Sequence, residues 1–186
     1  MKKHNLAFVD VETTGFNPDE HEVIELGAIV ARQVPSGDPE KGPRLEIIHE
    51  LEYKIKPQHI ETADPGALRV NGYSEADWLF AADLEQVMKD FAEKTAGATF
   101  VAHNLVFDWN FINKAFEKSS VKSKLHYAKL DTISIAFARL YHLEKAQTFS
   151  LKALAELTGV ENEKAHTALA DARTTMRVYK KLLAID

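Results

Sequence analysis

The chain has 186 residues, of which 45% are hydrophobic and 27% charged, a composition typical of a globular protein with room for one buried core. It contains no cysteine, which excludes disulfides, thiolate metal sites and a cysteine nucleophile and fits a reducing cytoplasm. No apolar run is long enough to cross a bilayer, and the first residues, MKKHNLAFVD, lack the apolar core of a signal peptide. We therefore expect a cytoplasmic protein without membrane association.

The net charge of −5 argues against a protein that coats nucleic acid over its whole surface. The charge is uneven, because residues 122–186 carry a net +4 and residues 1–121 a net −9. The acidic first part is either a solvated surface or a set of carboxylates gathered around cations. Composition alone does not choose between the two.

Three strands are predicted in the first third of the chain. Leu6 to Val9 and Val23 to Ala31 are apolar runs, separated by a segment at residues 13–19 that is dense in turn formers. Residues 34–44 contain three prolines and two glycines and are predicted to form a loop. Leu45 to Ile55 then reads as the third strand.

Helices dominate from residue 64 onward, with short strands predicted at Thr99 to Ala102 and near Lys129 to Leu130. Strands followed by alternating helices and strands are typical of a mixed sheet covered by helices. No repeat or flexible linker divides the chain. The sequence therefore predicts an α/β fold in which residues 1–186 form a single domain.

Two acidic residues interrupt the apolar pattern at the end of the first strand. Asp10 and Glu12 are two positions apart, so their side chains point to the same face of a strand and are close enough to share a cation. An isolated pair of this kind is more often a solvated strand end. The pair gains weight only if other carboxylates join it.

Two aspartates lie inside the apolar stripes of predicted helices. Asp108 is one turn before Phe111 in a helix expected to start near it, and Asp171 falls within the stripe of the last helix, from Ala168 to Leu183. A buried carboxylate must be protonated, paired, hydrogen-bonded or bound to metal, since burying it alone costs several kcal/mol. Asp108 could alternatively cap the N-terminus of its helix.

His166 precedes Asp171 by five residues, which on one helix would place the two about 140° apart. It can reach the Asp171 site only from the loop or first turn before the helix, and residues 161–164 after Gly159 read as such a loop. A surface histidine is the alternative. A histidine that titrates near neutrality suits a general base that activates water.

Oxygen ligands of this kind favour hard cations. Sites built only from oxygen ligands are typical of Mg²⁺ or Mn²⁺ and not of Zn²⁺, and two such ions bridged by carboxylates promote in-line attack of water on a phosphodiester. The sequence therefore predicts a nuclease that depends on divalent metal.

Three segments resemble the motifs of the DnaQ-like (DEDD) 3′–5′ exonuclease superfamily, in the branch whose last motif contains histidine (DEDDh). They are FVDVETTG at residues 8–15, VAHNLVFDWNFI at 101–112 and AHTALADA at 165–172. Matches at LDT (130–132) and SLKALAELTGV (150–160) extend the resemblance along nearly the whole chain. The resemblance implies a ribonuclease H-like fold, with a mixed five-stranded sheet flanked by helices.

The resemblance also implies the roles of the acidic residues. Asp10, Glu12, Asp108 and Asp171 would hold two Mg²⁺ ions, for which Mn²⁺ would substitute. Asp10 would bridge both ions, and His166 would deprotonate the attacking water.

A nucleotide pocket is implied in the same way. Thr13 and Thr14 would contact the terminal nucleotide through backbone or hydroxyl groups. His103, Asn104 and Phe107 would line the pocket.

Some positions depart from the family pattern or fall outside its motifs. Asn71 stands where the family often has histidine, and the loop at residues 34–44 is long. Asp131 belongs to none of the three motifs and is interpreted as structural. Helical periodicity places Phe111 in the core, and Ser150 is expected to cap the helix that follows it.

The reaction implied is hydrolysis at the 3′ end of single-stranded DNA or RNA, releasing nucleoside 5′-monophosphates. One alternative is a proofreading subunit held by a DNA polymerase, and a homodimer is another possible assembly. A catalytically inactive nucleic-acid-binding module is less favoured, because all five expected site residues are present. DNA and RNA stay equal candidates, because the 2′-hydroxyl is sensed by pocket geometry.

Overall fold

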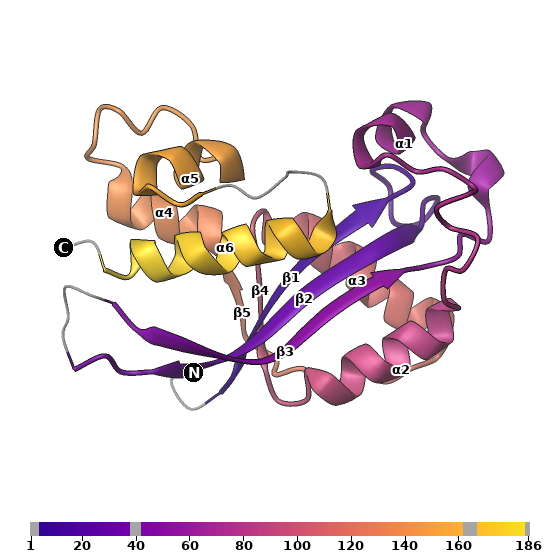
Figure 1. Ribbon diagram of the computed structural model, residues 1–186, viewed down its shortest axis with the longest axis horizontal. Coiled ribbons are helices and arrows are strands. Elements are labelled where there is room, and N and C mark those ends of the chain that lie inside the picture. The colour runs from indigo at the N-terminus through magenta and orange to yellow at the C-terminus, as the bar shows by residue number, and fades with distance from the viewer. Residues whose placement is uncertain (1–3, 38–41, 162–166, 185–186) are drawn as a thin grey trace.

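The computed structural model describes residues 4–37, 42–161 and 167–184, which form a five-stranded sheet between two layers of helices (Figure 1). The strand order is β3-β2-β1-β4-β5, with antiparallel pairs on one side of β1 and parallel pairs on the other. This confirms the predicted α/β architecture with a mixed five-stranded sheet.

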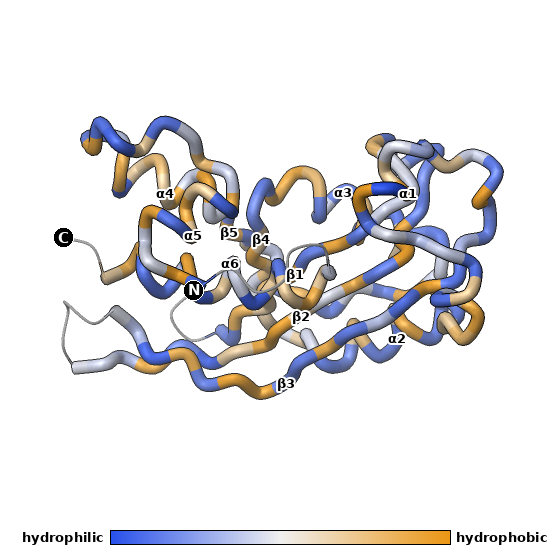
Figure 2. The backbone as a smooth tube through the Cα atoms, turned by 45° about the horizontal axis from the view of Figure 1, so that its top comes forward, coloured by the Kyte–Doolittle hydropathy of each residue, from blue (hydrophilic) through white to orange (hydrophobic). Residues whose placement is uncertain are grey.

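The strands agree with the sequence prediction to within a few residues at each end. Their bounds are β1 Leu6–Thr13, β2 Val23–Val34, β3 Arg44–Lys54, β4 Thr99–Ala102 and β5 Lys129–Asp131. The proline-rich segment after residue 34 separates β2 from β3, as predicted. β3 is an edge strand, and hydrophobic and hydrophilic residues alternate along it (Figure 2).

The helices divide between the two faces of the sheet. One face is covered by α4 Thr132–Leu140, α5 Leu151–Thr158 and α6 Ala168–Leu182. The other is covered by α2 Leu84–Lys94 and α3 Leu105–Ser119, while α1 Pro65–Asn71 lies beside the end of β1 after the short helix η2 Ile60–Thr62. None of the described helices combines the length and apolarity needed to span a bilayer.

Side chains of β1 alternate between the two helix layers. Leu6 and Phe8 pack on the α6 side of the sheet. The alternate residues Ala7, Val9 and Val11 belong to the core under α2 and α3. Asp10 and Glu12 continue the series of Leu6 and Phe8, so they point to the α6 side. The same alternation that builds the core therefore directs both carboxylates to one face.

The neighbouring strand β4 ends early. It pairs with β1 only from Leu6↔Thr99 to Phe8↔Val101. Beyond Phe8, no described strand covers this edge of β1, and its backbone amides are open to other acceptors. Helix α3 follows β4 almost directly, which brings its first turn next to this open edge.

Helix α6 lies close against β2 at Gly27. A Cβ atom at this position would be 2.2 Å from the carbonyl carbon of Ala168 and 2.2 Å from the amide nitrogen of Leu169, so only glycine fits. Glu25, two residues earlier in β2, accepts a hydrogen bond from the Ala168 amide at 2.8 Å. These contacts fix the N-terminus of α6 on the sheet.

Helix ends show where local prediction succeeds and where it fails. Ser150 caps α5 by accepting from the Ala153 amide, as predicted. The helix expected to start near Asp108 begins instead at Leu105, and its N-cap is Asn104, which has a φ of 71°. The alternative interpretation of Asp108 as an N-cap is therefore wrong.

We expect Gly27→Ala to lower the free energy of unfolding by about 3 kcal/mol, because the added methyl group meets backbone atoms that cannot rotate away. The control is Gly97→Ala, where φ is 72° and no neighbouring atom lies within 4 Å of the added Cβ, so the loss should be about 1 kcal/mol. Urea denaturation measures both. Equal losses would contradict close docking of α6.

Candidate active site

Three carboxylates meet where β1 ends beside the N-terminus of α6. Asp10, Glu12 and Asp171 each offer an oxygen, and the three oxygens lie within 4.8 Å of one another. Ligands of one Mg²⁺ ion lie at most about 4.2 Å apart, because each Mg–O distance is about 2.1 Å. Small side-chain rotations would therefore complete a coordination sphere, and the donor set of hard oxygens fits Mg²⁺ or Mn²⁺.

Asp108 reaches this cluster from the opposite helix layer. It lies in the first turn of α3, is 3% exposed, and its Oδ1 accepts a hydrogen bond from the Val11 amide at 3.1 Å. That amide belongs to the edge of β1 that β4 leaves open. The structure thus brings oxygens of three of the four predicted carboxylates within 4.8 Å of one another and places the fourth carboxylate beside them.

A fifth carboxylate, Glu25, was missed by sequence reasoning. It is 4% exposed and lies directly opposite Glu12 in the β1–β2 register. Its signal was present, since it is the single charged residue in the apolar run VIELGAIV of β2. The same test that singles out Asp108, a carboxylate where apolar residues are expected, would have found it.

Burial and mutual repulsion oppose ionisation of the cluster. Burial raises the pKa of Asp10 well above its usual range, and the charges of Asp108, Asp171 and Glu12 raise it further. Burial, then the charges of Glu25 and Asp171, raises the pKa of Glu12 to about 7. A bound divalent cation or added protons would relieve this repulsion.

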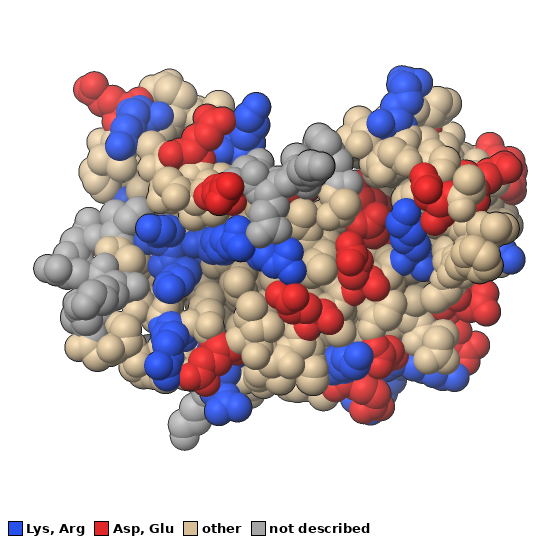
Figure 3. All heavy atoms as spheres, in the orientation of Figure 1, with Lys and Arg blue, Asp and Glu red and all other residues tan. Residues whose placement is uncertain are grey.

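The surface around the site divides by charge. In Figure 3, basic side chains form a band across the region that α6 occupies in Figure 1, while acidic side chains gather beyond its N-terminal end. Basic and acidic side chains thus occupy neighbouring regions of this face. In the acidic first part of the sequence, Asp10 and Glu12 converge with Asp171 on one place, so this part is more than a solvated surface.

An open hollow of about 500 Å³ adjoins Glu12. It is lined by the end of β1 and the turn after it, by α1 with its N-cap, and by Phe107. Phe16, which is 76% exposed, and Phe107 form an edge-to-face pair with centroids 6.5 Å apart. A hollow of this size fits a small ligand, and aromatic rings of this kind stack on nucleic-acid bases.

Some of the residues predicted for the nucleotide pocket line the hollow, and others hold its lining in place by hydrogen bonds. Thr13 and Phe107 line the hollow. Thr14 is fully buried and its hydroxyl accepts from the Glu22 amide at 2.9 Å, so it holds the turn after β1. Asn71 also lines the hollow, and its side-chain amide donates to the Thr13 carbonyl at 2.9 Å, which ties α1 to the end of β1.

His103 and Asn104 follow β4 directly and contact the residues at the start of α4. The His103 ring is 2.9 Å from the Thr132 hydroxyl, and burial lowers the pKa of His103, which favours its neutral form. The backbone amide of Asn104 donates a hydrogen bond to the Asp131 carboxylate at 3.2 Å. Among the described residues, neither His103 nor Asn104 lines the hollow beside Glu12.

Asp131 has the structural surroundings predicted for it. Its side chain accepts from the backbone amides of Ile133 and Ser134 at the start of α4 and from Asn104 and Leu105 at the start of α3. Burial alone would raise its pKa, but the hydrogen bonds, beginning with that of Ser134, outweigh burial and hold the pKa of Asp131 below its usual range.

His166 lies outside the described residues, as does the middle of the loop at residues 34–44. The predicted role of His166 therefore stays a prediction. Asp171, five residues later, is held in the first turn of α6, which Thr167 caps by accepting from the Ala170 amide.

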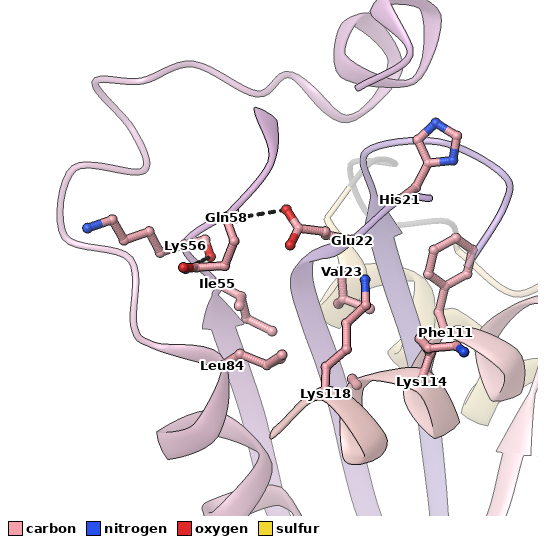
Figure 4. A pocket seen from close by; sticks show the side chains of 11 residues that line it. His21, Glu22, Val23, Ile55, Lys56, Gln58, Leu84, Phe111, Lys114 and Lys118 are labelled. Carbon is pink, nitrogen blue, oxygen red and sulfur yellow. Dashed lines mark hydrogen bonds between the residues drawn. The ribbon is translucent and has the colours of Figure 1, made fainter. Parts of the chain in front are cut away.

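A second cavity lies apart from the carboxylates, between the ends of β2 and β3 and helix α3 (Figure 4). Its walls include Val23, Ile55 and Phe111, and Phe111 is 2% exposed, as expected for a core residue. The enclosed space of about 20 Å³ holds about one water molecule, so it is too small for a nucleotide.

The chain matches the family model described as Exonuclease over residues 7–179. It is 28% identical over 183 residues to ribonuclease T of Shewanella frigidimarina, which covers 92% of this chain and 78% of that protein. It is 31% identical over 187 residues to the 3′-5′ exonuclease DinG of Staphylococcus epidermidis, which covers 94% of this chain but only 18% of that protein.

Among solved structures, E. coli exonuclease I in complex with a dT13 oligonucleotide superposes with a TM-score of 0.75 at 20% identity, covering 95% of this chain and 40% of that chain. This likeness supports the ribonuclease H-like fold. The matched family region includes β1, α3 and the first turns of α6, which carry all four predicted metal ligands. The chain therefore belongs to the exonuclease family and is a hydrolytic nuclease.

Proposed function

We propose that the chain is a 3′–5′ exonuclease that hydrolyses single-stranded DNA or RNA with two Mg²⁺ or Mn²⁺ ions and releases nucleoside 5′-monophosphates. The observation that carries the proposal is the convergence of Asp10, Glu12 and Asp171, with Asp108 beside them. The names of the relatives, which include a ribonuclease and a 3′-5′ exonuclease, support the same direction and substrate class.

The chain's own residues divide the work of hydrolysis. Asp10, Glu12, Asp108 and Asp171 would hold the cations, and bound cations would supply positive charge at the phosphate and lower the pKa of the attacking water. His166 takes the proton from that water. The water oxygen forms a bond to phosphorus and the bond to the 3′-oxygen of the preceding nucleotide breaks. That oxygen takes up a proton from solvent to become the new 3′-hydroxyl, and the terminal nucleotide leaves with a 5′-phosphate.

The hollow beside Glu12 is proposed to hold the 3′-terminal nucleotide. Phe16 and Phe107 offer aromatic faces to its base, and Thr13 at the end of β1 offers backbone to its sugar. A base in this hollow has its phosphate next to Glu12, at the carboxylate cluster. Stacking on an aromatic ring tolerates any base, which suits an enzyme that degrades mixed sequence.

Electrostatics disfavours the competing hypothesis of an inactive binding module. Phosphates are repelled by an ionised carboxylate cluster unless cations lie between them. A module that only grips nucleic acid gains nothing from burying Asp10 and Asp108 at raised pKa. A DNA polymerase or a second copy of the chain as partner stays a prediction.

A metal requirement tests this function directly. On an oligonucleotide labelled at its 5′ end, we expect labelled products that shorten stepwise from the 3′ end in Mg²⁺ or Mn²⁺ and no cleavage in EDTA. Matched DNA and RNA strands identify the preferred sugar. Full activity of metal-stripped protein in EDTA would contradict the two-metal mechanism. Release of the labelled 5′-terminal nucleotide as the first product would show degradation from the 5′ end and contradict the proposed 3′–5′ direction.

The same ions should raise the melting temperature, and more so at pH 8 than at pH 5.5. The pKa of Glu12 is about 7 in the fold against 4.5 for a free side chain. The metal-free fold therefore loses stability as pH rises between these values, because the unfolded chain ionises more easily. A Mn²⁺ effect that is larger at pH 5.5 would contradict this electrostatic account.

Alanine substitutions distinguish the aspartates proposed to bind metal from Asp131, which is proposed to be structural. Asp10→Ala, Asp108→Ala and Asp171→Ala should each cut turnover by more than about 100-fold, since even outer partners of metal ligands are worth about 10–100-fold. These variants should stay folded, because each loses a repelled charge. Asp131→Ala should instead lose about 2 kcal/mol of stability, with activity proportional to folded protein. A stable, inactive Asp131→Ala would contradict the assignment.

His166→Ala should keep Mn²⁺ and strand binding but slow the chemical step by about 10²–10⁴-fold, the usual contribution of a positioned base. Single-turnover rates and oligonucleotide affinity in Ca²⁺ measure the two effects separately. A folded His166→Ala enzyme with near-normal turnover would assign activation of the water to the metal alone.

A further inference from the structure

Glu25 makes a long-range contact at the end of the helix that carries Asp171. Its Oε1 accepts a hydrogen bond from the Ala168 amide at 2.8 Å, although 143 positions separate the two residues. Ala168 is the first residue of α6, and the first amides of a helix have no partner within the helix. Glu25 thus joins the sheet to the free end of α6.

An ordinary cap for this helix end is already present. Thr167 accepts from the Ala170 amide, as an N-cap residue normally does. Burying a carboxyl group in an apolar strand is unfavourable, and burial raises the pKa of Glu25. Thr167 and Glu25 therefore serve different amides of this helix end, and the acceptor for the buried Ala168 amide comes from β2.

The contact bears directly on the geometry of the metal site. Asp171 is one turn beyond Ala168 in the same rigid helix, so a shift of the first turn moves its carboxylate by a similar amount. Metal–ligand distances tolerate only about 0.2 Å. Gly27 allows the first turn of α6 to approach β2 closely, and the hydrogen bond to Glu25 holds that turn on β2. Strand β2 pairs with β1, which carries Asp10 and Glu12.

We propose that Glu25 is a positioning residue for cation binding, acting as the acceptor that holds the first turn of α6 so that Asp171 meets Asp10 and Glu12. The inference rests on the proposed function, because it assigns Glu25 to the same cation site. The proposed role depends on the hydrogen bond that Glu25 accepts from Ala168 and not on the charge of Glu25. A neutral side chain of the same length that can accept this hydrogen bond should therefore also position α6.

The test compares Mn²⁺ affinity among folded variants by calorimetry, well below their melting temperatures. Glu25→Ala should weaken Mn²⁺ binding by about 10–100-fold, as loss of an outer partner of a metal site does. Glu25→Gln keeps an acceptor in place and should restore affinity to near that of the wild type. The control, Ser150→Ala, removes one N-cap hydrogen bond from α5, which carries none of the carboxylates, and should lower the melting temperature without changing Mn²⁺ affinity.

Turnover gives a second readout. Glu25→Ala should lower kcat with little change in KM for a short oligonucleotide, because the hollow for the terminal nucleotide is built from other elements. Glu25→Asp keeps the charge but retracts the acceptor by one methylene group, and it should behave like Glu25→Ala. It also serves as the folded comparison where alanine at this buried position prevents folding.

The outcomes separate this inference from the proposed function. Normal Mn²⁺ affinity in folded Glu25→Ala or Glu25→Asp overturns the positioning role and leaves the exonuclease standing. Weak binding by folded Glu25→Gln also overturns it, since the charge would then matter more than the acceptor. A wild-type chain that binds no Mn²⁺ and cleaves no oligonucleotide overturns both.

Discussion

Repulsion among carboxylates is the constraint on which the rest of the structure depends. Oxygens of Asp10, Glu12 and Asp171 lie within 4.8 Å of one another, with Asp108 adjacent, and all four residues are at least partly buried. Like charges held this close destabilise the fold unless other contacts fix the elements that carry them. Those contacts are largely backbone ones, namely the ladder of β1 with β2 and the close approach of α6 at Gly27.

The short strand β4 lets both helix layers contribute to one site. Because β4 leaves β1 after Phe8, the Val11 amide is open, and Asp108 accepts from it. A longer β4 would cover that amide and separate Asp108, which comes from the α3 layer, from Asp171, which comes from the α6 layer. The early end of β4 therefore allows Asp108 to lie beside the carboxylates of β1.

The distribution of charge reconciles an acidic protein with a polyanionic substrate. A net charge of −5 repels nucleic acid at a distance, but the carboxylates that gather in the site would be offset by bound divalent ions. The basic band across α6 lies on the same face as the acidic region (Figure 3). The net charge of −5 therefore does not describe this face, on which basic and acidic regions are neighbours.

The sequence alone singled out four carboxylates as candidate metal ligands, because strand alternation and helical periodicity are local. Alternation places Asp10 and Glu12 on one face, and a 3.6-residue period exposes Asp108 and Asp171 as charges within apolar stripes. Only the tertiary structure decided what depends on pairing between distant segments. The β1–β2 register sets Glu25 opposite Glu12, and the docking of α6 joins Glu25 to Ala168. No local pattern encodes that register or that docking, since both are set by packing between residues far apart in the chain.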